Sequence, residues 1–135
     1  MIHLTPEQRV FVLERHVATL TTLRPDGTPH VVPVAFTWDA DAGVALVTTD
    51  DGSAKVRNVE AARAAGRPAR GALCQVSGGR WLTLEGELTV SREPADIADA
   101  ERRHAVRYPP LEPEPLRVVL RLLVDHVLGS VYMTR

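Results

Sequence analysis

The sequence has few of the residues that would place the protein at a membrane, on nucleic acid or in an oxidising compartment. Cys74 is the single cysteine among 135 residues, which excludes an internal disulfide. No apolar run approaches the roughly 20 residues of a membrane-spanning helix, and the first residues lack the pattern of a signal peptide. The net charge of −1 provides no basic footprint for nucleic acid. We therefore expect a cytoplasmic protein with no membrane and no nucleic-acid partner.

Motifs for metal, nucleotide and nucleophilic chemistry are also missing. The histidines, at positions 3, 16, 30, 104 and 126, show no metal-ligand spacing, so no metal site is predicted. The sequence has no serine-centred elbow, no glycine-rich dinucleotide fingerprint and no P-loop. Cys74 lies in an apolar stretch and is expected to be an inert buried thiol. The catalytic residues stay unassigned, and a bound cofactor is expected to carry any reaction.

The patterning predicts one mostly β domain over residues 1–135. Thr5, Pro6 and Gln8 form a capping box, which starts a helix that runs to about His16. Two more helices are predicted over 54–65 and 93–108. Six strands are predicted over 17–23, 29–38, 44–49, 72–77, 81–91 and 116–128, with 131–133 as an alternative further strand. Turn-type links between the strands favour an antiparallel barrel with flanking helices, because closure removes exposed strand edges.

Residues 48–58 combine the end of a strand, a glycine turn and the start of a helix. Free N–H groups at a helix start, together with the positive end of the helix dipole, favour an anion. Ser53 can donate its hydroxyl, while Lys55, the only lysine, and Arg57 add positive charge. The alternative is a plain capped helix with two solvated bases, and two aspartates before the turn favour it unless they point away. Both a phosphate site and an ordinary helix start therefore stay open.

Two other stretches are candidates for the wall of a ligand site. Residues 29–36 form a strand that contains Pro33, which cannot donate to a ladder and so favours an edge or a bulge. A core strand is the simpler interpretation, and an apolar wall that binds the edge of a ring is the other. Trp38 and Trp81 each lie beside a turn, where an indole serves either packing or ligand contact.

In order and spacing, these motifs resemble the pyridoxamine-phosphate-oxidase-like split-barrel flavoproteins. The similarity rests on the Pro-Asp-Gly hairpin at residues 25–27, the Pro-His-Val-Val-Pro-Val strand at 29–34 and the Ser-x-Lys-x-x-Asn helix start at 53–58. It spans nearly the whole chain and is greatest to an actinobacterial branch that uses the deazaflavin coenzyme F420 rather than FMN. The resemblance implies a six-stranded antiparallel split β-barrel, the FMN-binding split barrel, with flanking helices. It also implies a homodimer with two cofactor sites at the subunit interface.

The resemblance assigns the cofactor contacts by position. The phosphate would be held by Ser53, Lys55 and Asn58, and the ring would lie along Val32, Pro33 and Val34. Thr48 and Thr49 lie on the strand beside it, and Gln75 and Trp81 come from strands that face the interface. With Arg57 from the helix-start argument, these are the predicted cofactor-binding residues.

The implied activity is hydride transfer from reduced F420 to a conjugated small-molecule substrate, with biliverdin as one candidate. The protein would orient the donor carbon against the acceptor carbon. Arg57 and Arg80 are candidates for binding a carboxylate of substrate or cofactor, since a guanidinium forms two parallel bonds to it. Two alternatives stay open: an FMN-dependent oxidoreductase of the same fold, and a non-catalytic protein that binds a flavin, haem or tetrapyrrole.

Overall fold

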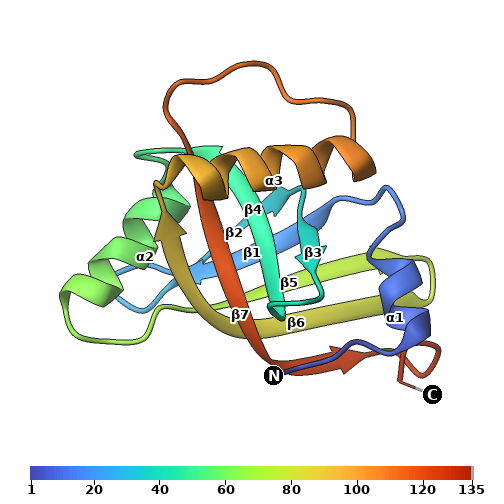
Figure 1. The fold of residues 1–135 in the computed structure, drawn as a ribbon. Coiled ribbons are helices and arrows are strands. Elements are labelled where there is room, and N and C mark those ends of the chain that lie inside the picture. Colours follow the sequence, from blue (N-terminus) through green and yellow to red (C-terminus); the bar gives the residue numbers. More distant parts are fainter. Residues whose placement is uncertain (135) are drawn as a thin grey trace.

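Within residues 1–134, which the computed structural model describes, the chain forms three helices and seven strands (Figure 1). The helices are α1 (Pro6–Phe11), α2 (Ala54–Ala64) and α3 (Pro94–Arg107). The strands are β1 (Ala18–Leu23), β2 (Pro29–Val34), β3 (Thr37–Asp39), β4 (Val44–Asp50), β5 (Arg70–Ser77), β6 (Arg80–Ser91) and β7 (Arg117–Gly129). None of the helices in this part of the chain has both the length and the apolar character to span a membrane.

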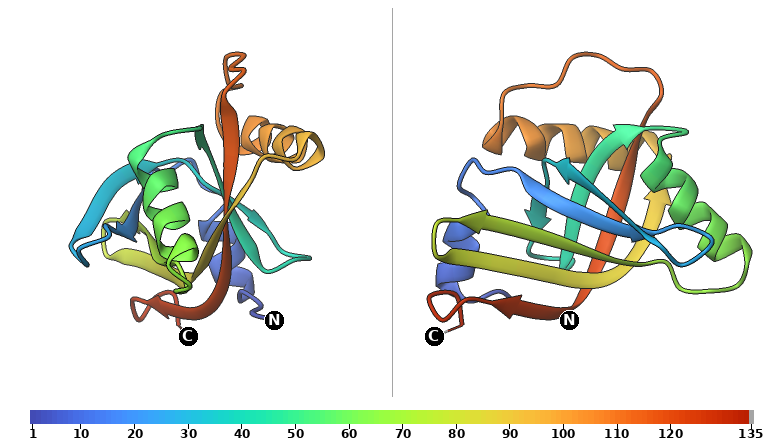
Figure 2. Two further views of the ribbon diagram at one scale, coloured as in Figure 1. Left: turned by 90° about the vertical axis from the view of Figure 1, so that its left-hand side faces the viewer. Right: turned by 180° about the vertical axis from the view of Figure 1, so that it is seen from behind.

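The strands form one antiparallel sheet whose two edges are consecutive in the sequence. Its order is β2-β1-β5-β6-β7-β4-β3, so the edge strands are β2 and β3. Ala35 and Phe36 alone join them, so the Cα atoms of Val34 and Thr37 are at most about 11 Å apart. The sheet must therefore curl until its edges meet, as the two views in Figure 2 show. Among the described residues no ladder pairs β2 with β3 or β4, so the barrel is split at this seam.

The predicted six-stranded count was one short, because the expected strand 29–38 is two strands. Residues 29–34 pair with β1, whereas residues 37–39 pair with β4 on the other side of the seam. One straight strand cannot reach both partners, and the chain bends at Phe36, whose ring is buried. The predicted split-barrel fold with flanking helices is confirmed, while residues 131–133 form a turn and not a further strand.

The barrel interior is filled by alternate side chains of the long strands. Along β6, leucines 82, 84 and 88 point inward and are buried, as the period-two pattern predicts. α2 covers one end of the barrel and buries Val56 and Val59 in this core. α3 packs outside, where Ala100 joins a second cluster with residues of β4 and β7 (Figure 1). Cys74 was expected to be buried, but it is partly exposed because the register turns it to the outer face opposite Thr83.

α1 begins as predicted and ends earlier than predicted. Thr5 and Gln8 form the reciprocal capping box. The helix stops at Phe11, and the chain then turns through 3₁₀-type bonds instead of continuing to His16. Gln75 donates to the carbonyl oxygen of Phe11 at 2.8 Å, so this turn is fastened to the middle of the sheet.

Candidate functional site

Most of the predicted site residues lie on or next to the seam, where β2 and the end of β4 beyond β3 are not paired with each other. The β3–β4 ladder ends at Thr37, and continuing its register would set Thr49 level with Val34. β2 pairs with β1 instead, so the two strands part at this point. Residues 32–34 on β2 and Thr48 and Thr49 on β4 therefore lie on the two sides of the seam, and the side chain of Val34 is buried in the core. That the two stretches hold one cofactor between them stays a prediction.

α2 begins shortly after β4 ends, next to the seam. Gly52, with a φ of 87°, makes the turn that leads from β4 into the helix. Ser53 occupies the N-cap position, but its side chain caps no N–H group and its Oγ instead accepts a bond from Thr49 Oγ1 at 3.3 Å. The first turn contains no acidic residue. Its N–H groups and the positive end of the helix dipole are thus available to an anion.

Lys55 is a half-buried cation whose charged neighbour is Asp50. Its ammonium forms no hydrogen bond or ion pair with any residue in the described range 1–134. Burial lowers the pKa of Lys55, and the negative charge of Asp50 opposes that shift. A desolvated ammonium becomes more favourable when an anion binds beside it. The side chain therefore fits a phosphate.

The second aspartate before the helix does not compete for Lys55. Asp51 accepts two bonds from Arg92, at 3.0 and 2.8 Å, and Arg92 also binds Glu60. The guanidinium of Arg92 holds the pKa of Asp51 below its usual value. The charge of Asp51 is thus compensated away from the helix start, which removes one objection to an anion site there.

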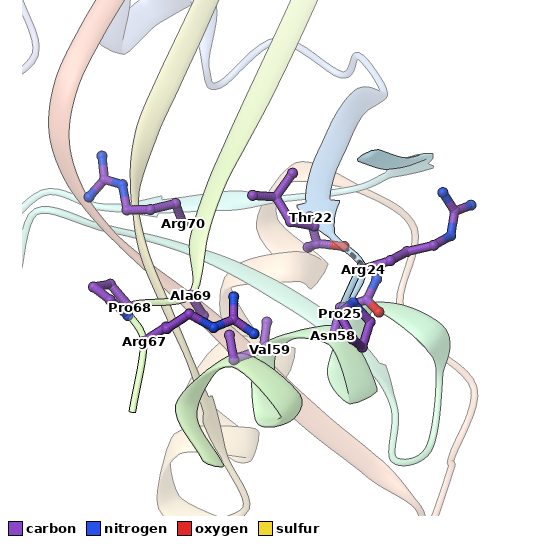
Figure 3. Close-up of a pocket in the computed structure, with 11 residues that line it drawn as sticks. Thr22, Arg24, Pro25, Asn58, Val59, Arg67, Pro68, Ala69 and Arg70 are labelled. Atoms are coloured by element: carbon purple, nitrogen blue, oxygen red, sulfur yellow. Dashed lines mark hydrogen bonds between the residues drawn. The ribbon is translucent and has the colours of Figure 1, made fainter. Parts of the chain in front are cut away.

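Asn58 and Arg57 lie close to Lys55 on the same helix but have partners of their own. Asn58 is 9% exposed and donates from Nδ2 to Thr22 Oγ1 at 3.0 Å. The cavity beside this pair has a volume of about 20 Å³, enough for a water molecule but not for a ring system (Figure 3). Arg57 is exposed and donates to the carbonyl oxygen of Gly52, so it folds back over the turn.

Gln75 and Trp81 do not lie at the seam between β2 and β4. Gln75 is 1% exposed, with its amide nitrogen bonded to Phe11 and its amide oxygen bonded to Arg107. Trp81 lies on the outer face of β6 opposite Val76 and is 38% exposed. Their contact with a cofactor stays a prediction.

Arg80 already has a carboxylate partner inside the chain. Its guanidinium binds both oxygens of Glu14, at 2.8 and 2.9 Å, and lies 4.7 Å from the centre of the Phe11 ring. Hydrogen bonds from Arg80 and then from His16 lower the pKa of Glu14 to about 2. The Arg80 guanidinium, a candidate for binding a substrate or cofactor carboxylate, is therefore already bound to Glu14.

Two residues that the sequence argument did not select hold the link between β2 and β3. Arg107 donates to the carbonyl oxygen of Phe36, and the Tyr108 hydroxyl accepts from the Phe36 N–H at 3.4 Å. The hydroxyl also donates to the carbonyl oxygen of His16 at 2.9 Å. The spacing of Ala100, His104 and Arg107 would have placed Arg107 on the buried helix face. The spacing would not have indicated which atoms Arg107 binds.

Comparison with known proteins identifies relatives over almost the whole chain. The family described as pyridoxamine 5'-phosphate oxidase matches residues 4–130. The F420H(2)-dependent biliverdin reductase of Mycobacterium tuberculosis (strain CDC 1551 / Oshkosh) is 44% identical over 127 residues, covering 94% of this chain and 88% of that protein. A solved structure named F420 reductase is 25% identical, with a TM-score of 0.68 over 92% of this chain and 98% of that one. A conserved hypothetical protein from Mycobacterium tuberculosis shares the fold, with a TM-score of 0.78 and 21% identity over 98% and 87% of the two chains.

Proposed function

Because the chain belongs to the pyridoxamine 5'-phosphate oxidase family, we propose that it is a cytoplasmic reductase that uses the reduced deazaflavin coenzyme F420. The relative that is 44% identical is named for this cofactor. The observation in this chain that carries the proposal is Lys55, a half-buried ammonium in the first turn of α2 that forms no ion pair with residues 1–134.

The residues around the split fit a phosphate-bearing planar cofactor. The first-turn N–H groups of α2, the Ser53 hydroxyl and Lys55 would hold the phosphate. β2 is an edge strand, so one row of its N–H and C=O groups is unpaired and can bind the edge of a ring along residues 32–34. Thr48 and Thr49 would line the facing side. When bound, reduced F420 supplies a hydride to a conjugated acceptor, and this chain binds and orients the reactants.

The proposed active form is a homodimer. The outer face of β5, β6 and β7 exposes Val76, Trp81 and Leu128, with exposed fractions of 58%, 38% and 40%. Large apolar side chains gathered on one sheet face are typical of a surface that another protein covers. A second copy on this face would bring Trp81 to the subunit interface, where the family resemblance assigns it a cofactor contact.

The proposed substrate is biliverdin or a similar linear tetrapyrrole. This assignment rests on the name of the 44% identical relative. The residues at the seam provide hydrogen-bond donors and one positive charge for binding. They include no hydrogen-bonded pair of an acidic and a basic side chain. The contribution of the chain is therefore assigned to binding and orientation, and the proton donor is left unassigned.

A side-by-side titration of the purified protein with F420 and FMN tests the cofactor. We expect a protein that purifies colourless, binds F420 more tightly than FMN and oxidises reduced F420 over many turnovers when biliverdin is added. A yellow protein that retains FMN would support the FMN-dependent alternative. Tight binding of F420 without turnover on any conjugated acceptor would support a non-catalytic binding protein.

A further inference from the structure

Arg107 is a buried cation at the end of α3 whose donors bind three separate parts of the chain. It is 5% exposed. Its Nε donates to the carbonyl oxygen of Glu14 at 2.9 Å, while its two terminal nitrogens donate to the carbonyl oxygen of Phe36 and to Oε1 of Gln75. Its guanidinium carbon lies 4.6 Å from the centre of the Phe36 ring. The side chain therefore joins the loop after α1, the β2–β3 link and the middle of β5.

The three acceptors are neutral, which is costly for a buried charge. Burial lowers the pKa of Arg107, and the nearby Tyr108 and the Glu14 carboxylate oppose that shift. Carbonyl oxygens and the negative end of the α3 dipole offset part of this cost. An apolar side chain would fill the same volume without desolvating a charge. The arrangement thus favours a role that needs a rigid fork with several donors.

One of the three partners adjoins the strand proposed to carry the cofactor ring, and a second lies in the same row of the sheet. Phe36 lies in the link after β2, two residues after Val34. Ala18 pairs with Val34 on one side and with Gln75 on the other, so these three residues form one row across the sheet. Arg107 holds this row at Gln75 and holds the link at Phe36. Both contacts act on the end of β2 that lies at the split.

We propose that Arg107 is a positioning residue for the cofactor ring. By fixing the β2–β3 link and Gln75, it holds residues 32–34 in the geometry that binds the ring edge, and it acts through these residues without touching the cofactor. This inference rests on the proposed function. It differs from the assignment of Lys55, because Lys55 is expected to bind the phosphate and Arg107 to shape the ring site.

Two probes separate these roles: F420 and its dephosphorylated deazaflavin riboside, which keeps the ring and lacks the phosphate. Arg107→Met keeps most of the side-chain volume and removes every donor. We expect this variant to bind both probes more weakly, by a similar factor of about ten or more. Lys55→Ala should weaken F420 only. Arg107→Lys should fall between the wild type and Arg107→Met, because one ammonium cannot span all three acceptors.

Arg102→Met is the matched control, since it removes a guanidinium from the same helix. Arg102 is exposed and is bonded to Asp99 at 3.3 Å, within α3 itself. This control should bind both probes like the wild type. Circular dichroism and thermal unfolding establish which variants are folded, and Arg107→Lys decides the matter if Arg107→Met is unfolded.

Wild-type affinity for both probes in a folded Arg107 variant would overturn the inference, as would a loss confined to F420. Failure of both Arg107 variants to fold would also overturn it, because the residue would then be structural only. If the wild type binds neither probe, the proposed function itself is wrong, and this result is distinct from any effect of Arg107.

Discussion

Asn58 donates a hydrogen bond from Nδ2 to Oγ1 of Thr22 at 3.0 Å, and both side chains are buried. Thr22 lies opposite His30 in the β1–β2 ladder. The bond therefore ties α2, which presents Lys55, to the hairpin that carries residues 32–34. Asn58 was predicted to be a phosphate ligand, and in the structure its amide nitrogen instead links α2 to β1.

This bond predicts coupled losses of stability. Asn58→Ala and Thr22→Val should each lower the free energy of unfolding by about 1–2 kcal/mol, because each removes a buried hydrogen bond. The loss in the free energy of unfolding of the double variant should be smaller than the sum of the two single losses, because both substitutions remove the same hydrogen bond. Urea unfolding of the four proteins measures the coupling. Strict additivity would show that the two side chains do not interact in solution.

Replacement of Lys55 should affect cofactor binding and spare the fold. Lys55→Ala is expected to weaken F420 binding by about tenfold to a hundredfold, the range for a charged hydrogen bond. Its free energy of unfolding should stay close to the wild-type value, because Lys55 forms no ion pair with residues 1–134. Fluorescence titration measures the affinity.

Arg63→Ala is the matched control for Lys55, since it removes one positive charge from the same helix. Arg63 is exposed and its bond to Glu87 at 3.4 Å lies far from the helix start. Equal losses of affinity in the two variants would show that net charge, and not a phosphate contact, accounts for the effect.

The ion pair between Glu14 and Arg80 predicts an acid-sensitive contribution to stability. Folding lowers the pKa of Glu14 from its ordinary value of 4.5 to about 2, chiefly through the Arg80 hydrogen bonds. A carboxyl with a depressed pKa in the folded state stabilises the protein fully above 4.5, and this contribution is lost as the pH falls towards 2. Glu14→Gln should therefore lose less stability than the wild type over this window. Thermal unfolding as a function of pH measures the difference, and parallel curves would contradict the assignment.

Gly86 predicts a large steric effect at the irregularity between β6 and β7. The ladder shifts register between Glu85 and Gly86, and a Cβ on Gly86 would lie 2.7 Å from the carbonyl carbon of Leu123. Because backbone atoms cannot yield easily, Gly86→Ala should destabilise the fold by about 2–4 kcal/mol. Gly79→Ala is the control, since its nearest contact is a Tyr132 side-chain atom at 3.6 Å. Equal unfolding midpoints for the two variants would show that the bulge can relax.

The features that the sequence predicted well depend on neighbours along the chain. The capping box at Thr5 and Gln8 and the alternation of leucines in β6 follow from spacing within one element. The helix start at Ser53 and Lys55 was also visible, because a strand end, a glycine turn and a cation are local signals. The split of the predicted strand at Phe36 was missed, because apolar patterning does not say with which strand each half pairs.

The sequence by itself thus determined the β-rich fold, its flanking helices and the unusual position of the only lysine. Tertiary structure alone decided which residues share the split, that Asn58 bonds Thr22, and that Arg107 reaches Phe36 and Gln75. The physical reason is that periodicity reports which face of an element is buried. Hydrogen-bond partners that lie 36 or 71 residues apart depend on how the curled sheet brings its edges together.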